Sequence, residues 1–161
     1  MTAMMRGQFV IILPNGNEII LPNTVVQEGA NAYLARIFQG ASITGFFIGL
    51  CDQGPVHTDT LSNIATEPTI GVNGYARQAL VQNGTDWPTI ATQNEETSIE
   101  SKQVDFVASG GDFDNAHSRL FLCSVLTGAA GVLYAYSAAL QVATTVLDTE
   151  TFSAKYQMFI N

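Results

Sequence analysis

The feature that most constrains this chain is a series of short apolar runs, each ended by a turn that contains glycine, asparagine or proline. The first two runs, Gln8–Leu13 and Glu18–Leu21, flank Pro14–Asn17, which contains Asn-Gly. Asn-Gly is a favoured pair for a two-residue hairpin turn, because both turn positions need positive φ. We therefore expect a β-hairpin at residues 1–22. A lone hairpin is only marginally stable in water, so we expect it to be an interaction arm.

Further strand-like runs follow along the chain. Their spacing by turns predicts a mainly β fold, an antiparallel β-sandwich or a jelly-roll-like barrel. Apolar and polar residues alternate in Thr151–Asn161, which is typical of a half-buried strand. In Ala129–Leu140 both faces are apolar or small, which indicates a strand that is either central or covered by a neighbouring subunit, and we favour the central position. The expected strands are Gly45–Cys51, Tyr75–Gln82, Gln103–Ala108, Leu120–Leu126, Val132–Leu140 and Phe152–Ile160.

One segment has helical rather than strand periodicity. Thr24 and Gln27 have the spacing of a capping box, and Gly40 supplies a stop, so we expect a helix at residues 25–39. Its apolar residues recur with helical spacing, and we expect them to face the core. They are Val26, Ala30, Tyr33, Leu34, Ile37 and Phe38.

The length of 161 residues fits a single domain, which we place at residues 23–161 behind the hairpin arm. Between the expected strands, Asp52–Asn73 is rich in hydroxyl and turn residues and is expected to be a long surface loop.

The charge of the chain limits its partners. Six basic residues against fourteen acids give a net charge of −8, and the bases are scattered, which argues against nucleic acid and anionic membranes. No apolar run approaches the roughly 20 residues that span a bilayer. Residues 1–13 lack the features of a signal peptide, so we expect synthesis in the cytoplasm. With 47% hydrophobic and only 12% charged residues, the composition suits a permanent protein assembly.

Residues with catalytic chemistry are few. Cys51 and Cys123 each lie in an apolar run, so we expect buried, reduced thiols. His57 and His117 belong to no metal-ligand pattern and are expected to be exposed or half-exposed. Nucleophile-elbow, P-loop and dinucleotide-binding motifs do not occur in the sequence. We therefore name no catalytic, cofactor-binding or metal-binding residue, and expect no cofactor.

Three weaker patterns have simpler structural explanations. The run from Gly110 to Asn115 offers oxygen ligands but lacks the later glutamate of a calcium loop, so a glycine-rich turn is favoured. Glu95, Glu96 and Glu100 crowd one polar stretch, as on a solvated loop. Tyr75 and Trp87 could stack on a sugar, but we expect Trp87-Pro88 to anchor a loop on the core.

Several segments resemble small virion proteins of tailed bacteriophages. The segment 23–40, followed by Ile43–Leu50, resembles their amino-terminal part, and Thr66–Pro68, Gly74–Arg77 and Trp87 continue the likeness. The resemblance spans about half of the chain and implies a non-catalytic particle component, with Gly74, Tyr75 and Arg77 in a turn and strand start. Arg77 could also pair with Glu67.

These observations favour a capsid decoration, or cement, protein located in the virion. We expect a homo-oligomer, with a trimer as the preferred number, that binds the major capsid protein or other virion proteins. The alternatives are a tail-fibre, collar or baseplate module, and a receptor- or glycan-binding domain that uses the Asp52–Asn73 loop. An enzyme with an unrecognised site is a further class.

Overall fold

A computed structural model describes residues 5–43, 45–52, 54 and 56–160 of the chain. The helices are α1 (Gln27–Gln39) and the short 3-10 helix η1 (Leu61–Asn63). The strands are β1 (Met5–Ile12), β2 (Glu18–Val25), β3 (Phe46–Cys51), β4 (Gln78–Leu80), β5 (Thr89–Gln93), β6 (Glu96–Glu100), β7 (Val104–Val107), β8 (Arg119–Cys123), β9 (Leu133–Ser137) and β10 (Thr151–Ile160).

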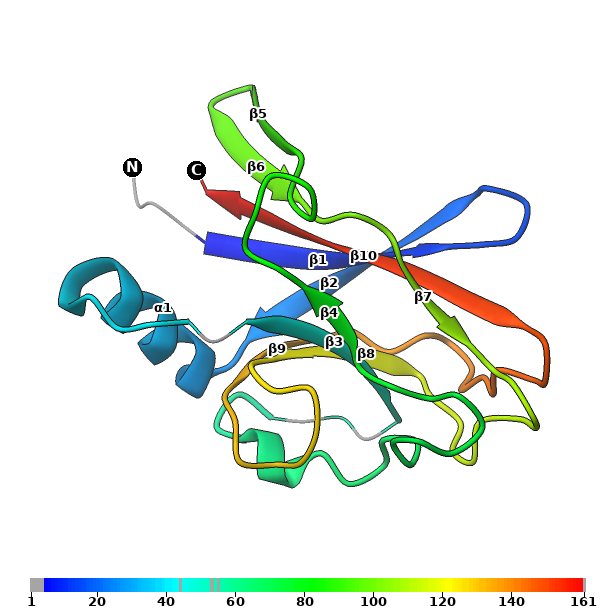
Figure 1. Ribbon diagram of the computed structural model, residues 1–161. Coiled ribbons are helices and arrows are strands. Elements are labelled where there is room, and N and C mark those ends of the chain that lie inside the picture. The colour runs from blue at the N-terminus through cyan, green and yellow to red at the C-terminus, as the bar shows by residue number, and fades with distance from the viewer. Residues whose placement is uncertain (1–4, 44, 53, 55, 161) are drawn as a thin grey trace.

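The described strands form one antiparallel sheet that curls into a half-barrel (Figure 1). Its order is β4-β3-β8-β9-β2-β1-β10-β6-β5, and β7 pairs with β10 beside this path. Strand β2 joins the two halves, since residues 18–22 pair with β1 and residues 23–25 pair with β9. The expected mainly β, antiparallel fold with one α-helix is confirmed, and β9 is central, as its two apolar faces predict.

The N-terminal hairpin is present, but it is not a free arm. β1 and β2 pair antiparallel, and Gly16 has a φ of 81° in the turn between them. β1 also pairs with β10 along its whole length, from Met5 opposite Ile160 to Ile12 opposite Ser153. The expected separate arm at residues 1–22 is therefore wrong for the described part, because β1 lies inside the sheet. Residues 1–4 lie outside the described residues.

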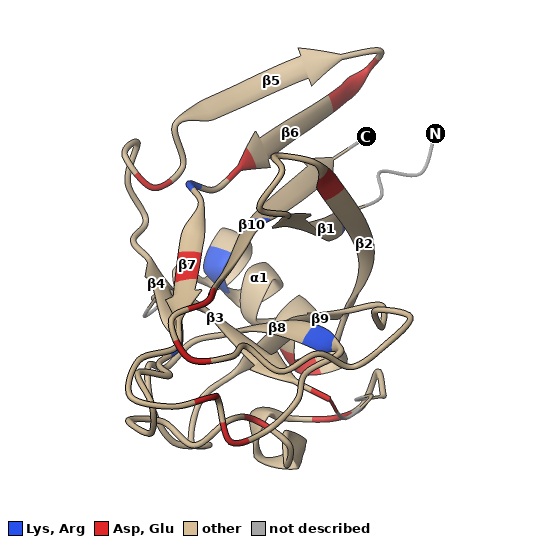
Figure 2. Cartoon of the chain, turned by 90° about the vertical axis from the view of Figure 1, so that its right-hand side faces the viewer, with Lys and Arg blue, Asp and Glu red and all other residues tan. Residues whose placement is uncertain are grey.

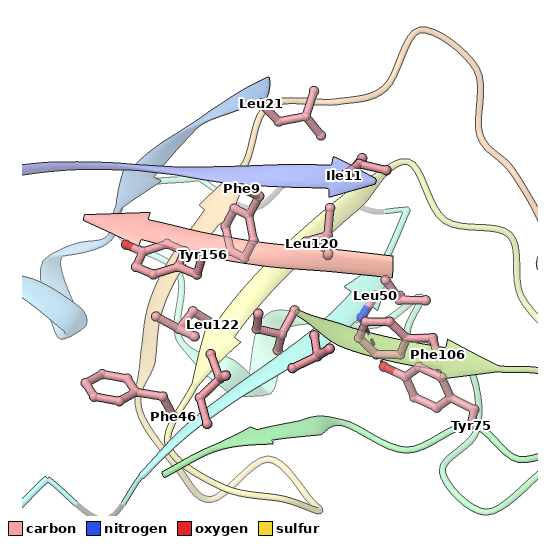
Figure 3. Packing of buried hydrophobic residues seen from close by; sticks show 14 of the residues in the cluster. Phe9, Ile11, Leu21, Phe46, Leu50, Tyr75, Phe106, Leu120, Leu122 and Tyr156 are labelled. Atoms are coloured by element: carbon pink, nitrogen blue, oxygen red, sulfur yellow. Dashed lines mark hydrogen bonds between the residues drawn. The ribbon is translucent and has the colours of Figure 1, made fainter. Parts of the chain in front are cut away.

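The main core fills the inside of the curl. Strands from both halves of the sheet point large side chains into the same space (Figure 3). The ring of Phe9 meets that of Tyr156 edge to face at 5.0 Å, which joins β1 to β10. Other buried members of this core are Ile11, Leu50, Phe106, Leu120 and Leu122.

A second, smaller core lies on the outer face of β3, β8 and β9. It contains Cys51, Phe121, Cys123 and Leu133, and the loop at residues 52–73 covers it with Leu61. Because these strands are buried on both faces, β3 and β8 read as continuous apolar runs. Gly49 of β3 leaves room for the ring of Phe121, since a Cβ at Gly49 would lie 2.3 Å from that ring.

The start of α1 differs from the expectation. Thr24 is paired with Tyr136 in the sheet, and the residue before the helix, Val26, makes no side-chain cap, so the expected capping box is wrong. Pairing in the sheet holds Thr24 in extended backbone. Instead, Glu28 accepts a hydrogen bond from the backbone N–H of Leu133 in β9, at 2.8 Å.

The apolar stripe of α1 also differs from the expectation, because only part of it faces the core. The helix meets β9 at Gly29, where a Cβ would lie 2.2 Å from the carbonyl oxygen of Tyr134, and at Tyr33, which stacks on the Tyr134 ring. This close approach fixes the rotation of the helix. Leu34, Ile37 and Phe38 are therefore exposed, contrary to expectation, whereas Gly40 ends the helix with a φ of 68° as predicted.

The sequence pattern gave no signal for the β5–β6 hairpin. Glu96 and Glu100, expected on a solvated loop, are instead the first and last residues of β6. Asn94 and Glu95 form the tight turn before it, with φ of 51° and 66°. Positive φ at both turn positions is usually supplied by Asn-Gly or Asp-Gly. Because glutamate replaces glycine here, the turn lacks the usual hairpin signature.

The placement of two leucines predicts different effects of one substitution. Leu122 is fully buried, so Leu122→Ala should lower the free energy of unfolding by about 2 to 5 kcal/mol. Leu34 is 55% exposed, so Leu34→Ala should cost less than about 1 kcal/mol. Urea unfolding of both variants provides the measurement, and equal losses would contradict the orientation of α1.

Candidate interaction surfaces and the sites that fix them

The Arg77–Glu67 ion pair suggested by the sequence is confirmed. The Nε of Arg77 donates to one carboxylate oxygen of Glu67 at 2.9 Å, and Nη2 donates to the other at 2.7 Å. Nη1 donates to the carbonyls of Val125 and Gly128, at 3.0 and 2.9 Å. Arg77 is thereby buried with hydrogen bonds to two separate loops.

Tyr75 extends this network into the core. Its hydroxyl donates to Glu67 at 2.8 Å and accepts from the backbone N–H of Leu50 in β3 at 3.0 Å. Burial raises the pKa of Tyr75 well above its ordinary value. Both oxygens of the Glu67 carboxylate therefore hold structural partners, which makes this group an anchor for the end of the 52–73 loop.

The 52–73 loop is expected from the sequence, and its described part is fastened at several points; positions 53 and 55 lie outside the described residues. Thr66 accepts from the backbone N–H of Asp52, and His57 lies 3.0 Å from the carbonyl oxygen of Val25. His57 is exposed, as predicted. The loop therefore acts as a cover for the outer face of the sheet.

His117 is buried, so the expected exposed position is wrong. Its backbone bridges to Thr144, and its ring meets Phe152 edge to face at 4.6 Å. Neither ring nitrogen has a hydrogen-bond partner among the described residues. Burial lowers the pKa of His117 to about 4, although the nearby charge of Asp52 partly opposes the shift. The sequence places His117 just before a strand and cannot show that Phe152 covers it.

The two cysteines are reduced and buried, as predicted. Both lie in the outer core, on β3 and β8. Burial raises the pKa of Cys51 to about 12 and that of Cys123 to about 11. Both thiols are therefore protonated at neutral pH, where a protonated thiol is a poor nucleophile.

The glycine-rich run from Gly110 to Asn115 is a turn, as favoured above. Asp148 accepts hydrogen bonds from the backbone N–H groups of Gly110 and Gly111, at 3.0 and 3.1 Å. Asp114 accepts from the N–H of Thr69 at 2.8 Å, and the pKa of Asp114 is lowered by hydrogen bonding to the Thr69 side chain and then to its backbone. The acids of this region thus stabilise backbone turns.

Trp87 anchors its loop on the core, as expected. Its ring meets Phe46 edge to face at 5.7 Å. The preceding residue, Asp86, binds Lys102 at 2.9 Å and accepts from the N–H of Val81, and these contacts lower the pKa of Asp86. The segment that carries Trp87 is thereby fixed between β4 and the end of β6.

The β5–β6 hairpin stands apart from the half-barrel (Figure 2). Within the described part of the chain β5 pairs with β6 alone and forms one edge of the sheet, with all five residues exposed. Figure 2 shows no charged residue on β5, whereas acids occupy the tip of the hairpin and the end of β6. Ile90 of β5 is 71% exposed. This edge therefore offers unpaired backbone groups and an apolar side chain to another molecule.

The outer face of α1 is the second exposed apolar surface. Leu34, Ile37 and Phe38 lie on one side of the helix, and Phe38 is 79% exposed. The helical spacing of these residues was visible in the sequence, but their exposure was not. Which face of α1 meets the sheet depends on the close contact at Gly29.

Within the described residues, no group of histidine, cysteine and acidic side chains could hold a metal ion. The described helices are all too short or too polar to cross a bilayer. The chain matches no protein-family model, and it matches no curated protein.

The Arg77 network predicts a large effect of its loss. Arg77→Met should lower the free energy of unfolding by about 3 to 5 kcal/mol, because Glu67 would be left buried without its charge partner. The matched control is Arg6→Met, which removes the exposed ion pair with Glu96 and should cost less than about 1 kcal/mol. Chemical unfolding measures both, and adding Glu67→Gln to Arg77→Met should recover part of the loss.

His117 predicts a specific loss of stability in acid. Between pH 6.5 and about 4 the unfolded chain binds a proton at His117 that the folded chain resists. The resulting loss is on the order of 3 kcal/mol as pH falls through this window, and it is absent above pH 6.5. His117→Leu should remove this part of the acid sensitivity, whereas His57→Gln should keep it.

Unfolding free energies at pH 7 and pH 4 test this prediction. The carboxylates titrate in all three proteins, so the difference between His117→Leu and the wild type isolates His117. An identical acid loss in these two proteins would contradict the prediction.

Proposed function

We propose that this chain is a non-enzymatic structural protein that attaches to other protein subunits through the free edge of β5. The observation that carries the proposal is the exposed, uncharged edge of a hairpin that projects from the half-barrel. Soluble proteins usually protect edge strands with lysine, proline, bulges or covering segments. No residue of β5, Thr89–Gln93, is charged or a proline, which fits a strand that pairs with a partner.

The most specific form of the proposal is a capsid decoration protein. The resemblance of segments 23–40, 43–50, 66–68 and 74–77 to bacteriophage virion proteins supports this assignment, as does the low content of charged residues. Such a protein would act as a homo-oligomer, with a trimer preferred, and contact the major capsid protein. A stable interface buries about 800 Å² per partner, and a lattice multiplies its effect through avidity.

The second candidate is a tail-fibre, collar or baseplate module of the same kind of particle. The same free edge supports it, because β-strand addition suits any permanent assembly. The number of copies per particle separates the two locations. Hundreds of copies would favour decoration of the head, and a few dozen or fewer would favour the tail.

The third candidate, a receptor- or glycan-binding domain built on the 52–73 loop, has less support. Leu61 in this loop is buried in the outer core, and Glu67 is bound by Arg77, so these residues already have structural roles. Loss of glycan binding on Trp87→Ala would favour this candidate.

A charge on the β5 edge tests the proposal. Ile90→Lys should reduce association with particles that lack this protein by about tenfold or more, because burying an unpaired charge at each contact costs more than about 1.4 kcal/mol. Co-sedimentation of the purified variant with such particles provides the measurement. Because Ile90 is exposed, the variant should melt like the wild type.

The matched control is Val142→Lys. Val142 is 74% exposed but lies in the segment between β9 and β10, outside the hairpin. Its variant should associate with particles normally. Normal association of a folded Ile90→Lys variant would overturn the role of the β5 edge.

A further inference from the structure

A groove lies between α1, the ends of β1, β6 and β10, and the loop after β4. It has a volume of about 480 Å³, within the range of small-molecule sites. Its walls are almost entirely apolar and include Ile37 of α1, Phe46 of β3, Ile99 of β6 and Met158 of β10. The role proposed above does not use this groove.

Two polar groups in the wall of the groove have no partner. The Tyr33 hydroxyl and the Trp87 indole N–H are buried, and neither makes a hydrogen bond within the described part of the chain. Tyr33 is only 7% exposed, so water does not readily serve its hydroxyl. A buried polar group without a hydrogen bond costs free energy. A ligand that carries a hydrogen-bond acceptor would recover this cost.

A cation completes the wall. Arg36 of α1 lines the groove, and its guanidinium donates to the carbonyl oxygen of Ala41 at 3.0 Å. No ion pair joins Arg36 to a described carboxylate, although the chain carries fourteen acids and six basic residues. The guanidinium therefore retains donors for an anion, and Arg36 is suited to a carboxylate in particular.

From these three features we infer that the groove binds a soluble amphiphilic carboxylate of the fatty-acid class. The alkyl chain packs against Ile37, Ile99 and Met158, and the carboxylate meets Arg36. A change in the orientation of the Tyr33 or Trp87 side chain would bring its donor to an oxygen of the ligand. The site is distinct from the β5 edge, so this inference does not depend on the assembly role proposed above.

Trp87 makes the test direct, because it is the single tryptophan of the chain and lines the groove. Dodecanoate, titrated below its critical micelle concentration, should change the Trp87 fluorescence in a saturable way. It should also raise the melting temperature, because a ligand of the native state stabilises that state. A detergent effect would instead lower the melting temperature without saturation, and that result would overturn the inference.

Two substitutions on α1 form a matched pair for the apolar wall. Ile37 lines the groove and is exposed, so Ile37→Asp should fold normally and abolish dodecanoate binding by placing a like charge at the site. Leu34→Asp makes the same change one turn earlier, at an exposed position outside the groove, and should leave binding intact. Equal affinity of both variants for dodecanoate would overturn the inference.

The polar groups are tested by smaller changes. Arg36→Gln should weaken dodecanoate binding by about tenfold but leave dodecanol binding within about threefold, whereas Arg36→Lys should retain most of the preference for dodecanoate. Tyr33→Phe removes a hydroxyl that has no partner, so it should weaken binding without lowering stability. If dodecanoate and dodecanol bind the wild type equally well, the assignment of a carboxylate ligand is wrong.

Discussion

The guanidinium of Arg77 binds two loops that are far apart in the sequence, residues 52–73 and the connection between β8 and β9. Through Glu67 it holds the end of the 52–73 loop, and through two carbonyls it holds the loop between β8 and β9. Tyr75 ties the same carboxylate to β3. Because a buried charge must be paired and fully hydrogen-bonded, these loops have little freedom to move independently. The cover of the outer core depends on this arrangement.

Burial on both faces of β3, β8 and β9 decides which surfaces are left for partners. The inner face carries the main core, and the 52–73 loop covers the outer face, so this half of the sheet has little apolar surface to offer. Among the exposed apolar side chains are Ile90 on β5 and Leu34, Ile37 and Phe38 on the outer side of α1, where Ile37 also lines the groove.

The sequence predicted those parts of the candidate sites that depend on local chemistry. The Arg77–Glu67 pair could be anticipated, because the two opposite charges are only ten residues apart in the sequence. The turn at 110–115 could be anticipated, because its two glycines readily adopt positive φ. The burial of His117 and the exposure of the outer face of α1 could not be predicted in this way. Their burial and exposure depend on Phe152 and on Tyr134, residues far along the chain. The groove likewise gathers Tyr33, Trp87 and the end of β10, which no local pattern connects.

The sequence by itself determined the mainly β class, the positions of most strands and the end of α1 at Gly40, because strand alternation and positive φ are local properties of the chain. It did not determine the partners of those strands. The tertiary structure placed β1 between β2 and β10, set the rotation of α1 by the contact at Gly29, and gave β5 a partner strand on one side alone among the described residues. The reason is physical: register and rotation are set by which distant surfaces fit closely enough to exclude water.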